Sequence, residues 1–151
     1  MRRSSRWTEN EGGSASLEFI TAGMVLLVPV VYLILTMSSI QSASLAVEGA
    51  ARQAARVFVQ ADDSDAAARG ADNAIRFALA DSGLASEHAT VAIRCEPDPD
   101  DCLSRHGYVT VSISTSVPLP LTPPAVTVNQ PLAVTLESSA TQQVSRFRGA
   151  G

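Results

Sequence analysis

A long apolar run near the N-terminus constrains this 151-residue chain more than any other feature. From Phe19 to Val47 there is no charged side chain, and the run contains the apolar segment Ile20 to Ile40. A hydrocarbon core of roughly 30 Å needs about 20 helical residues, which is the length of this segment. Backbone groups inside lipid must be satisfied locally, so the segment is predicted to be a helix spanning about residues 20–40. Pro29 lies inside it, and membrane helices tolerate proline better than soluble helices do.

The arginines predict the orientation of this helix. The flank before the helix carries three arginines, Arg2, Arg3 and Arg6. The first basic residues after the apolar segment are Arg52 and Arg56. Short flanks rich in arginine stay in the cytoplasm. The chain is therefore predicted to be a single-pass protein of the cell membrane, with its N-terminus cytoplasmic and its C-terminal domain extracytoplasmic.

A cleaved secretory signal is the main alternative to a membrane span. The small-residue sequence Ser44-Leu45-Ala46 could serve as its cleavage site and release a secreted domain. Signal peptides have apolar regions of about 7–15 residues, and this run is longer. The length favours the span.

The junction before the apolar run has an unusual arrangement of residues. A peptidase cut after Gly13 would make Ser14 the new N-terminus, with Glu18 fifth and Phe19 sixth. The cut would also create a positive α-amino group, which Glu18 of a neighbouring subunit could neutralise away from bulk water. Alternatively, Glu18 simply lies among the lipid headgroups as a favourable acid near the start of a helix.

These residues resemble a type IV prepilin-like processing site: a short basic leader, Gly13, a small residue, then Glu18, an aromatic residue and a long apolar helix. With its later segments, the chain resembles the TadE-like proteins (TadE/TadG) of tight-adherence, or Flp, pilus assembly systems of actinobacterial type. The resemblance implies a pilin-like minor subunit (pseudopilin) or assembly factor, cleaved by a prepilin peptidase. Its partners would be other pilin-like subunits and the pilus assembly machinery. The early helix proline often found in the family appears here only at Pro29, so other pilin-like proteins stay open, as does a membrane-anchored binding domain of unrelated role.

The helix is predicted to continue beyond the membrane. Small residues and one aromatic recur there at four-residue spacing, at Ala46, Ala50, Ala54 and Phe58. Such a stripe lets another helix approach closely; the alternative is an exposed alanine-rich helix. The predicted organisation is a cytoplasmic leader over residues 1–13, the transmembrane helix and its extension over 14–60, and an extracytoplasmic domain over 61–151.

The extracytoplasmic domain is predicted to be α+β. The run Asp62-Asp63-Ser64-Asp65 offers N-caps for a second helix that runs to about Ala80, and Gly83 is placed to end it. Alternating apolar and polar residues then predict three strands of a small antiparallel sheet. They are Thr90–Cys95, Tyr108–Val117 and Leu132–Ser138, with a proline-rich loop over Pro118–Pro124. A long helix followed by a small antiparallel sheet is the general shape of pilin-like proteins.

Cys95 and Cys102 are predicted to form a disulfide, because the domain is expected outside the cytoplasm. Two metal sites compete with this interpretation. The cysteines with His88 and His106 match zinc spacing poorly. A calcium site would need the acidic residues between the cysteines, where prolines obstruct a compact loop: Glu96, Asp98, Asp100 and Asp101. No metal or cofactor is therefore expected.

The sequence also argues against catalysis and nucleic-acid binding. Lysine is absent, which excludes Schiff-base and P-loop chemistry, and no glycine-rich phosphate loop occurs. His88 and His106, the candidate bases near neutral pH, lie in polar, turn-like sequence. The net charge of −4 and the lack of a basic run do not suit a nucleic-acid partner. We expect no enzyme and no small-molecule substrate.

Overall fold

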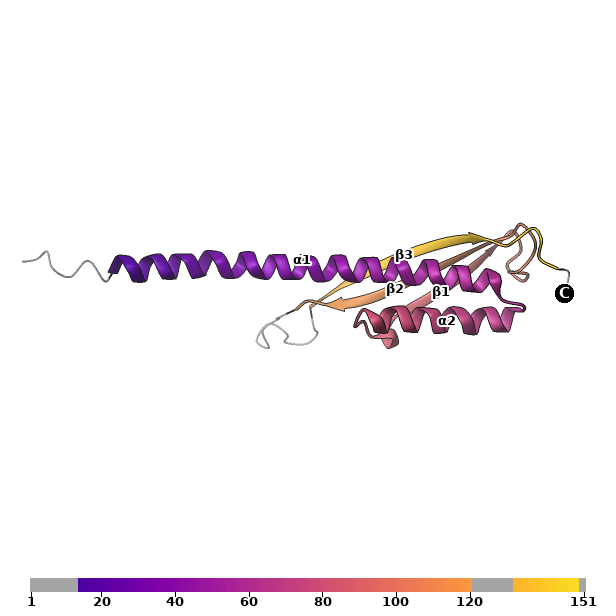
Figure 1. The fold of residues 1–151 in the computed structure, drawn as a ribbon, viewed down its shortest axis with the longest axis horizontal. Coiled ribbons are helices and arrows are strands. Elements are labelled where there is room, and N and C mark those ends of the chain that lie inside the picture. The colour runs from indigo at the N-terminus through magenta and orange to yellow at the C-terminus, as the bar shows by residue number, and fades with distance from the viewer. Residues whose placement is uncertain (1–13, 121–131, 150–151) are drawn as a thin grey trace, which may run out of the picture. The chain divides into compact units, whose positions relative to one another are not determined.

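The computed structural model describes residues 14–120 and 132–149. Two helices, a short 3₁₀ turn and three strands follow one another along the chain (Figure 1): α1 (Ser14–Gln60), α2 (Ser64–Asp81), η1 (Ser86–His88), β1 (Thr90–Glu96), β2 (Tyr108–Pro118) and β3 (Ala133–Gln143). The class is α+β, with a long apolar N-terminal helix, a second helix and a small antiparallel sheet, so the predicted fold class is confirmed.

The chain divides into two compact units, Met1–Met37 and Ser38–Gly151. The first unit contributes the start of α1 to the described structure, and this helix passes through Pro29 without a break. The second unit begins at Ser38 and contains the rest of α1, together with every other described helix and strand. The helical extension therefore folds together with the domain that follows it.

Within the second unit, α2 has a capping residue at each end. The Asp63 side chain accepts a hydrogen bond from the Ala66 backbone N–H (2.7 Å), which satisfies one of the free donors of the first turn. At the other end Gly83 adopts φ +70°, and the N–H groups of Gly83 and Leu84 donate to the carbonyls of Ala80 (3.0 Å) and Leu79 (2.9 Å). This hydrogen-bond pattern is a Schellman motif. Asp63 and Gly83 therefore begin and end α2 as predicted from the sequence.

The sheet is an antiparallel meander of order β1-β2-β3 with β2 in the centre. Side chains of β2 alternate strictly, and those on one face are buried: Val109, Val111, Ile113, Thr115 and Val117. The opposite face of β2 is mostly polar, and its side chains are half-buried or exposed. There the Thr110 and Thr141 hydroxyls are hydrogen bonded across the strands at 2.8 Å. One face of the sheet therefore builds the core, and the other faces solvent.

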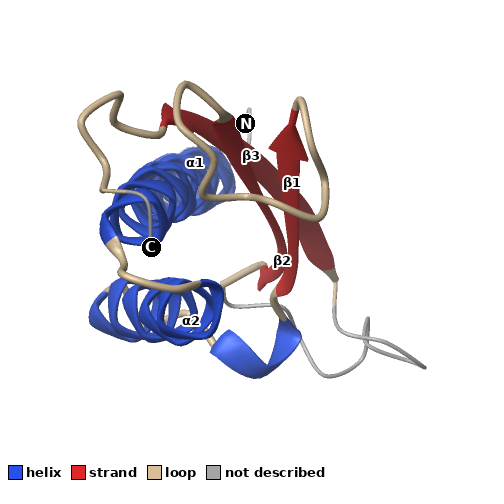
Figure 2. Ribbon diagram, turned by 90° about the vertical axis from the view of Figure 1, so that its right-hand side faces the viewer, coloured by secondary structure: helices blue, strands red, loops and turns tan. Residues whose placement is uncertain are grey.

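The core lies between the two helices and this apolar face of the sheet. Figure 2 shows α1 and α2 side by side on one side of the three strands. The helices contribute six alanines and four larger residues to this core. These are Val47, Ala50, Ala51, Ala54, Ala55 and Phe58 from α1, and Ala67, Ala71, Ile75 and Leu79 from α2. Small side chains let the helices approach closely. At Gly70 an added Cβ would lie 2.8 Å from Cγ1 of Val57.

Candidate functional site: the apolar helix, its N-terminal junction and the domain surface

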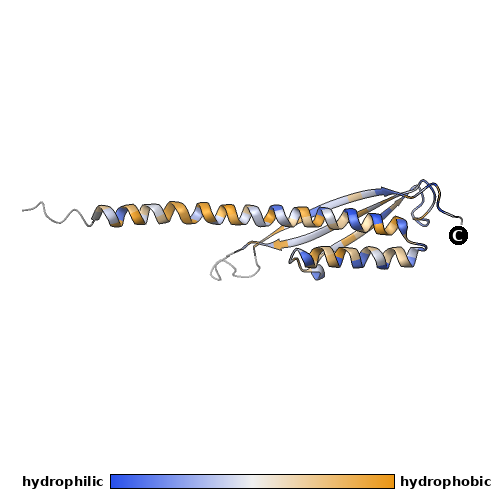
Figure 3. Cartoon of the chain, in the orientation of Figure 1, coloured by the Kyte–Doolittle hydropathy of each residue, from blue (hydrophilic) through white to orange (hydrophobic). Residues whose placement is uncertain are grey.

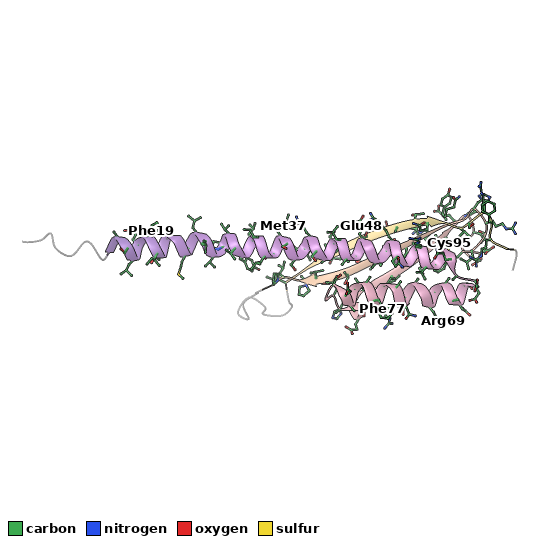
Figure 4. All side chains as sticks on the ribbon, in the orientation of Figure 1. Phe19, Met37, Glu48, Arg69, Phe77 and Cys95 are labelled. Carbon is green, nitrogen blue, oxygen red and sulfur yellow. A yellow bond between two sulfur atoms is a disulfide. The ribbon has the colours of Figure 1, made fainter. Side chains whose placement is uncertain are left out.

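The described part of the first unit is an apolar helix. Its large side chains are exposed around the whole circumference (Figure 4), and Phe19 is 80% exposed. Figure 3 shows apolar residues along this part of α1. Within residues 14–120 and 132–149, α1 alone is long and apolar enough to cross a membrane, judged by length and composition.

Two threonine hydroxyls inside this apolar stretch are satisfied within the helix. Thr21 Oγ1 donates to the carbonyl of Leu17 (2.7 Å), and Thr36 Oγ1 donates to that of Tyr32 (2.8 Å). Each bond reaches back four residues, to a carbonyl that already belongs to the helix. A threonine bonded in this way needs neither water nor another chain, which suits an apolar solvent.

The predicted processing junction lies at the start of α1. Ser14 is the first helical residue, and Gly13 lies outside the described residues. Glu18 follows Ser14 by four residues, which puts both on one face of the helix. Glu18 and Phe19 are both exposed. The described structure therefore leaves the Glu18 carboxylate open to an external partner.

The predicted packing stripe is occupied within the chain itself. Ala50, Ala54 and Phe58 are buried in the core cluster, whereas Ala46 is only half-buried. The cluster includes residues of α2 and the sheet, so these elements already cover most of the stripe. The sequence predicted that another helix would approach this face closely, and α2 of the same chain contributes to the cluster that buries it. Another side of α1 carries an exposed ion pair between Glu48 and Arg52.

The end of α1 is held by a residue that sequence reasoning did not find. Arg148 donates from Nη1 to the carbonyl of Val59 (3.3 Å) and from Nη2 to the carbonyls of Ala61 and Asp62, the latter at 2.8 Å. The last carbonyls of a helix lack intrahelical partners and carry partial negative charge, so a guanidinium there is favourable. The C-terminal tail is therefore tied to the α1–α2 turn. Nothing in the local sequence around Arg148 signals this contact.

Cys95 and Cys102 form a disulfide, with their Cα atoms 5.0 Å apart, as predicted. Cys95 is buried at the end of β1, and Cys102 closes the loop that leads to β2. His88 and His106 are both exposed. Across the described residues, no three His, Cys, Asp or Glu side chains converge as a metal site would require.

Two exposed aromatic residues lie on the surface of the second unit. Phe77 projects from α2 and is 76% exposed (Figure 4), and Phe147 in the tail is 81% exposed. The guanidinium of Arg146 stacks on the Phe147 ring, 4.6 Å from its centroid. Single exposed aromatics are ordinary surface features, so neither defines a binding site alone.

The chain has no significant match among protein-family models, curated proteins or solved structures.

Proposed function

We propose that this protein is a pilin-like membrane subunit: a pseudopilin or assembly factor of a tight-adherence pilus, in the manner of TadE-like proteins. The observation that carries the proposal is the division of α1. Its first part exposes large apolar side chains, and one face of its last part is buried in the core of an α+β domain. A single helix that combines an apolar stem with the core helix of a small domain suits a subunit that assembles from a membrane.

In this proposal the protein crosses the cell membrane once through residues of about 20–40. The basic leader over residues 1–13 lies in the cytoplasm, and the disulfide-bonded domain lies outside. A disulfide is stable in an oxidising compartment and rare in the cytosol, which supports this orientation.

A prepilin peptidase removes the leader after Gly13 in this proposal. The new N-terminus is Ser14, the first residue of α1, and its amino group is positive at neutral pH. The exposed Glu18 then pairs with the amino group of a neighbouring subunit as the apolar helices pack side by side. The pair gains strength because lipid and protein surround it in place of water.

The role is structural and noncatalytic in this proposal, and needs no metal or cofactor. Both histidines are exposed, and the polar face of the sheet carries hydroxyl groups bonded to one another rather than aimed into a cleft. The partners are other pilin-like subunits and the assembly machinery, which the extracytoplasmic domain contacts.

The N-terminal sequence of the mature protein, isolated from membranes of cells that express a complete pilus system, tests this proposal. A chain that begins at Ser14 supports it. A Gly13→Leu variant should then keep its leader, whereas the matched Gly12→Leu variant should be processed. A chain that begins near Val47 indicates a secreted domain released from a signal peptide, and an unprocessed chain indicates a plain membrane anchor.

Glu18 provides a second test within the same cells. Glu18→Ala should leave the protein in the membrane but stop its incorporation with other subunits. Glu11→Ala is the matched control, because Glu11 leaves with the leader. Normal assembly of the Glu18→Ala protein would favour a membrane-anchored binding domain of unrelated role.

A further inference from the structure

The three-stranded sheet has two free edges. β2 lies between β1 and β3 (Figure 2), so each outer strand is paired on one side only. Just beyond the ends of the β2–β3 ladder, the Val144 N–H donates to the Gly107 carbonyl (2.8 Å) and the Leu119 N–H donates to the Leu132 carbonyl (2.9 Å). Bonded and non-bonded pairs alternate in an antiparallel ladder, so even-numbered residues of β3 bond β2 and odd-numbered residues point to the free edge. The second group is Ala133, Thr135, Glu137, Ser139, Thr141 and Gln143.

The backbone groups of β1 follow from the same alternation. The odd-numbered residues of β2 bond β3, so its even-numbered residues bond β1, and Ser114 lies opposite Thr90. The backbone groups of Val91, Ile93 and Cys95 therefore point away from β2. Within residues 14–120 and 132–149, no backbone–backbone hydrogen bond outside the sheet uses the groups on either edge. A row of unpaired N–H and C=O groups is a template for a further strand.

Both edges also carry apolar side chains that the domain covers only in part. On the core side of β1, Val91 and Ile93 are 39% and 38% exposed, although the residues opposite them in β2 are buried. On the core side of β3, Val134 and Leu136 are half-buried. A strand added at either edge would cover these side chains, because its own side chains would continue the same face.

We propose that the β1 edge of one copy of this chain binds the β3 edge of the next copy in parallel, which joins their sheets. This inference rests on the proposed function and names the surface through which its subunits meet. β1 and β3 both run antiparallel to β2, so a second copy in the same orientation brings its β3 alongside β1 in parallel. A single contact then covers both edges, whereas pairing of β3 with itself would leave Val91 and Ile93 exposed.

The backbone restricts the register of this contact. In a parallel pair, a residue whose backbone points to the partner bonds the residues before and after the one opposite it. Each odd-numbered residue of β1 must therefore lie opposite an even-numbered residue of β3. The register that places Val91 opposite Val134 meets this condition and also places Ile93 opposite Leu136. All four side chains are then neighbours on the core side of the joined sheet.

Charge favours the same register. It places Arg94 opposite Glu137 on the outer face, and both side chains are exposed. Across the part of the chain that the structure describes, neither of them forms a salt bridge. Opposite charges on adjacent strands attract, and like charges repel. A shift of β3 by two residues in either direction separates this pair, and one of the two shifts puts Glu96 opposite Glu137.

The register also determines how successive copies are displaced. Within one sheet, Thr90 is level with Glu137, because both lie opposite Ser114. In the proposed contact Thr90 lies opposite Ala133 of the next copy, four residues earlier. Each copy is thus displaced along the strands by about 13 Å, at about 3.3 Å per residue. A contact between two different edges leaves one edge free at each end, so copies can add one after another in a stepped series, as in a filament.

Cysteine cross-linking between two variants tests this proposal. Cells that express a complete pilus system without the native copy make two forms of the full chain, each with its own affinity tag. One form carries Ala92→Cys and the other Thr135→Cys, because these exposed residues lie opposite each other in the proposed register. Neighbouring strands are about 4.8 Å apart, which is within the Cα separation of a disulfide. Membranes are oxidised with copper phenanthroline, and dimers are detected through both tags on a non-reducing gel.

We expect a cross-linked dimer that contains both tags. Ala92→Cys with Thr141→Cys is the matched control and should give none, since position 141 lies about 20 Å farther along β3. A dimer from Thr135→Cys with Thr141→Cys overturns the proposal, because these positions meet when two β3 edges pair in antiparallel fashion. The absence of a dimer from Ala92→Cys with Thr135→Cys overturns it as well.

Reversal of the two charges gives a second measurement. Arg94→Glu in the Ala92→Cys form should lower the dimer yield by about threefold, because two glutamates then face each other. Glu137→Arg in the Thr135→Cys form should restore the yield, since the pair is again of opposite sign. A loss that Glu137→Arg does not restore overturns the register.

The N-terminal sequence of the same membrane protein separates this inference from the proposed function. A chain that begins at Ser14 but gives no dimer overturns the edge contact alone. A dimer formed by an unprocessed chain supports the edge contact and rejects the prepilin-like processing.

Discussion

The two parts of α1 belong to one continuous helix but are built for different surroundings. Before Ser38 the helix carries large aliphatic side chains such as Leu27 and Leu33, and they are exposed on every side. After Ser38 its inner face consists mostly of buried alanines, and its outer face carries the exposed Glu48–Arg52 ion pair. Helix propensity does not distinguish the parts, since leucine and alanine both favour helix.

The difference lies in what each part must be packed against. A helix that is apolar all round needs an apolar solvent or complete burial, and the described residues do not bury the first part. A helix with small residues on one face and charges on the other suits the surface of a compact domain. Glu48 is the first charged residue after the apolar run, and from there on the sequence suits a helix that has one face in water.

The strongest test of the comparison places the same charge in each part. Leu27→Arg combined with Leu33→Arg should oppose membrane insertion by about 6 kcal/mol, because each arginine near the centre of a span is unfavourable by roughly 3 kcal/mol. Leu45→Arg is the matched control, since Leu45 is an exposed leucine of the second unit. Alkaline extraction of membranes should release the double variant and retain the control. Equal retention of both proteins would show that the first part of α1 is not a membrane span.

A second test uses the same aromatic residue in each part of the helix. Phe58 is 4% exposed in the core, whereas Phe19 is exposed at the other end of α1. Phe58→Ala should lower the free energy of unfolding of the domain by about 3–5 kcal/mol through lost burial and a cavity. Phe19→Ala should leave it unchanged. Thermal unfolding in detergent, followed by circular dichroism, measures both, and equal effects would contradict the division of α1.

Local signals in the sequence were enough for the helices and the strand positions. Asp63 and Gly83 act where they were predicted because caps depend on a few neighbouring residues. The strands were predicted from alternation, which works for β2 because one of its faces is buried throughout. β3 was predicted to end at Ser138 but continues to Gln143. Its polar end pairs with β2, and Gln143 Nε2 donates to the Tyr108 hydroxyl (3.2 Å).

Contacts between distant parts of the chain could not be predicted in the same way. The alanine stripe showed that something packs closely on α1, but periodicity cannot say whether the partner is another chain or this chain's own α2. Val144 is buried and Arg148 binds the end of α1, although both follow the last strand without any periodic pattern. Their positions depend on where the meander brings the tail. The long apolar helix was predictable from neighbouring residues alone. The disulfide was predictable from two cysteines close in sequence, together with the compartment expected for the domain.

A third test removes the disulfide of the second unit. Cys95→Ala with Cys102→Ala should lower the free energy of unfolding by about 2.5 kcal/mol, from the entropy of closing a loop of this length. Reduction of the unmodified protein should give a similar loss, and reductant should not affect the double variant. Helical signal from the first part of α1 should persist in both proteins. An unfolding midpoint that does not move on reduction would show that the loop is held in other ways.

The smallest effect is expected at two helical glycines of the second unit, which differ in their surroundings. Gly70 of α2 faces Val57, and an added methyl would meet its Cγ1 at 2.8 Å, whereas a methyl at Gly49 of α1 meets nothing within 4 Å. Alanine favours helix over glycine by about 1 kcal/mol, so Gly49→Ala should stabilise the domain by up to that amount.

Gly70→Ala should instead destabilise it by about 1 kcal/mol. Val57 is restricted at χ1 and cannot easily turn aside, and overpacking costs about 1–3 kcal/mol. Adding Val57→Ala to Gly70→Ala should recover most of the loss, measured by thermal unfolding. If Gly70→Ala stabilises the domain as Gly49→Ala does, the two helices are not in close contact there.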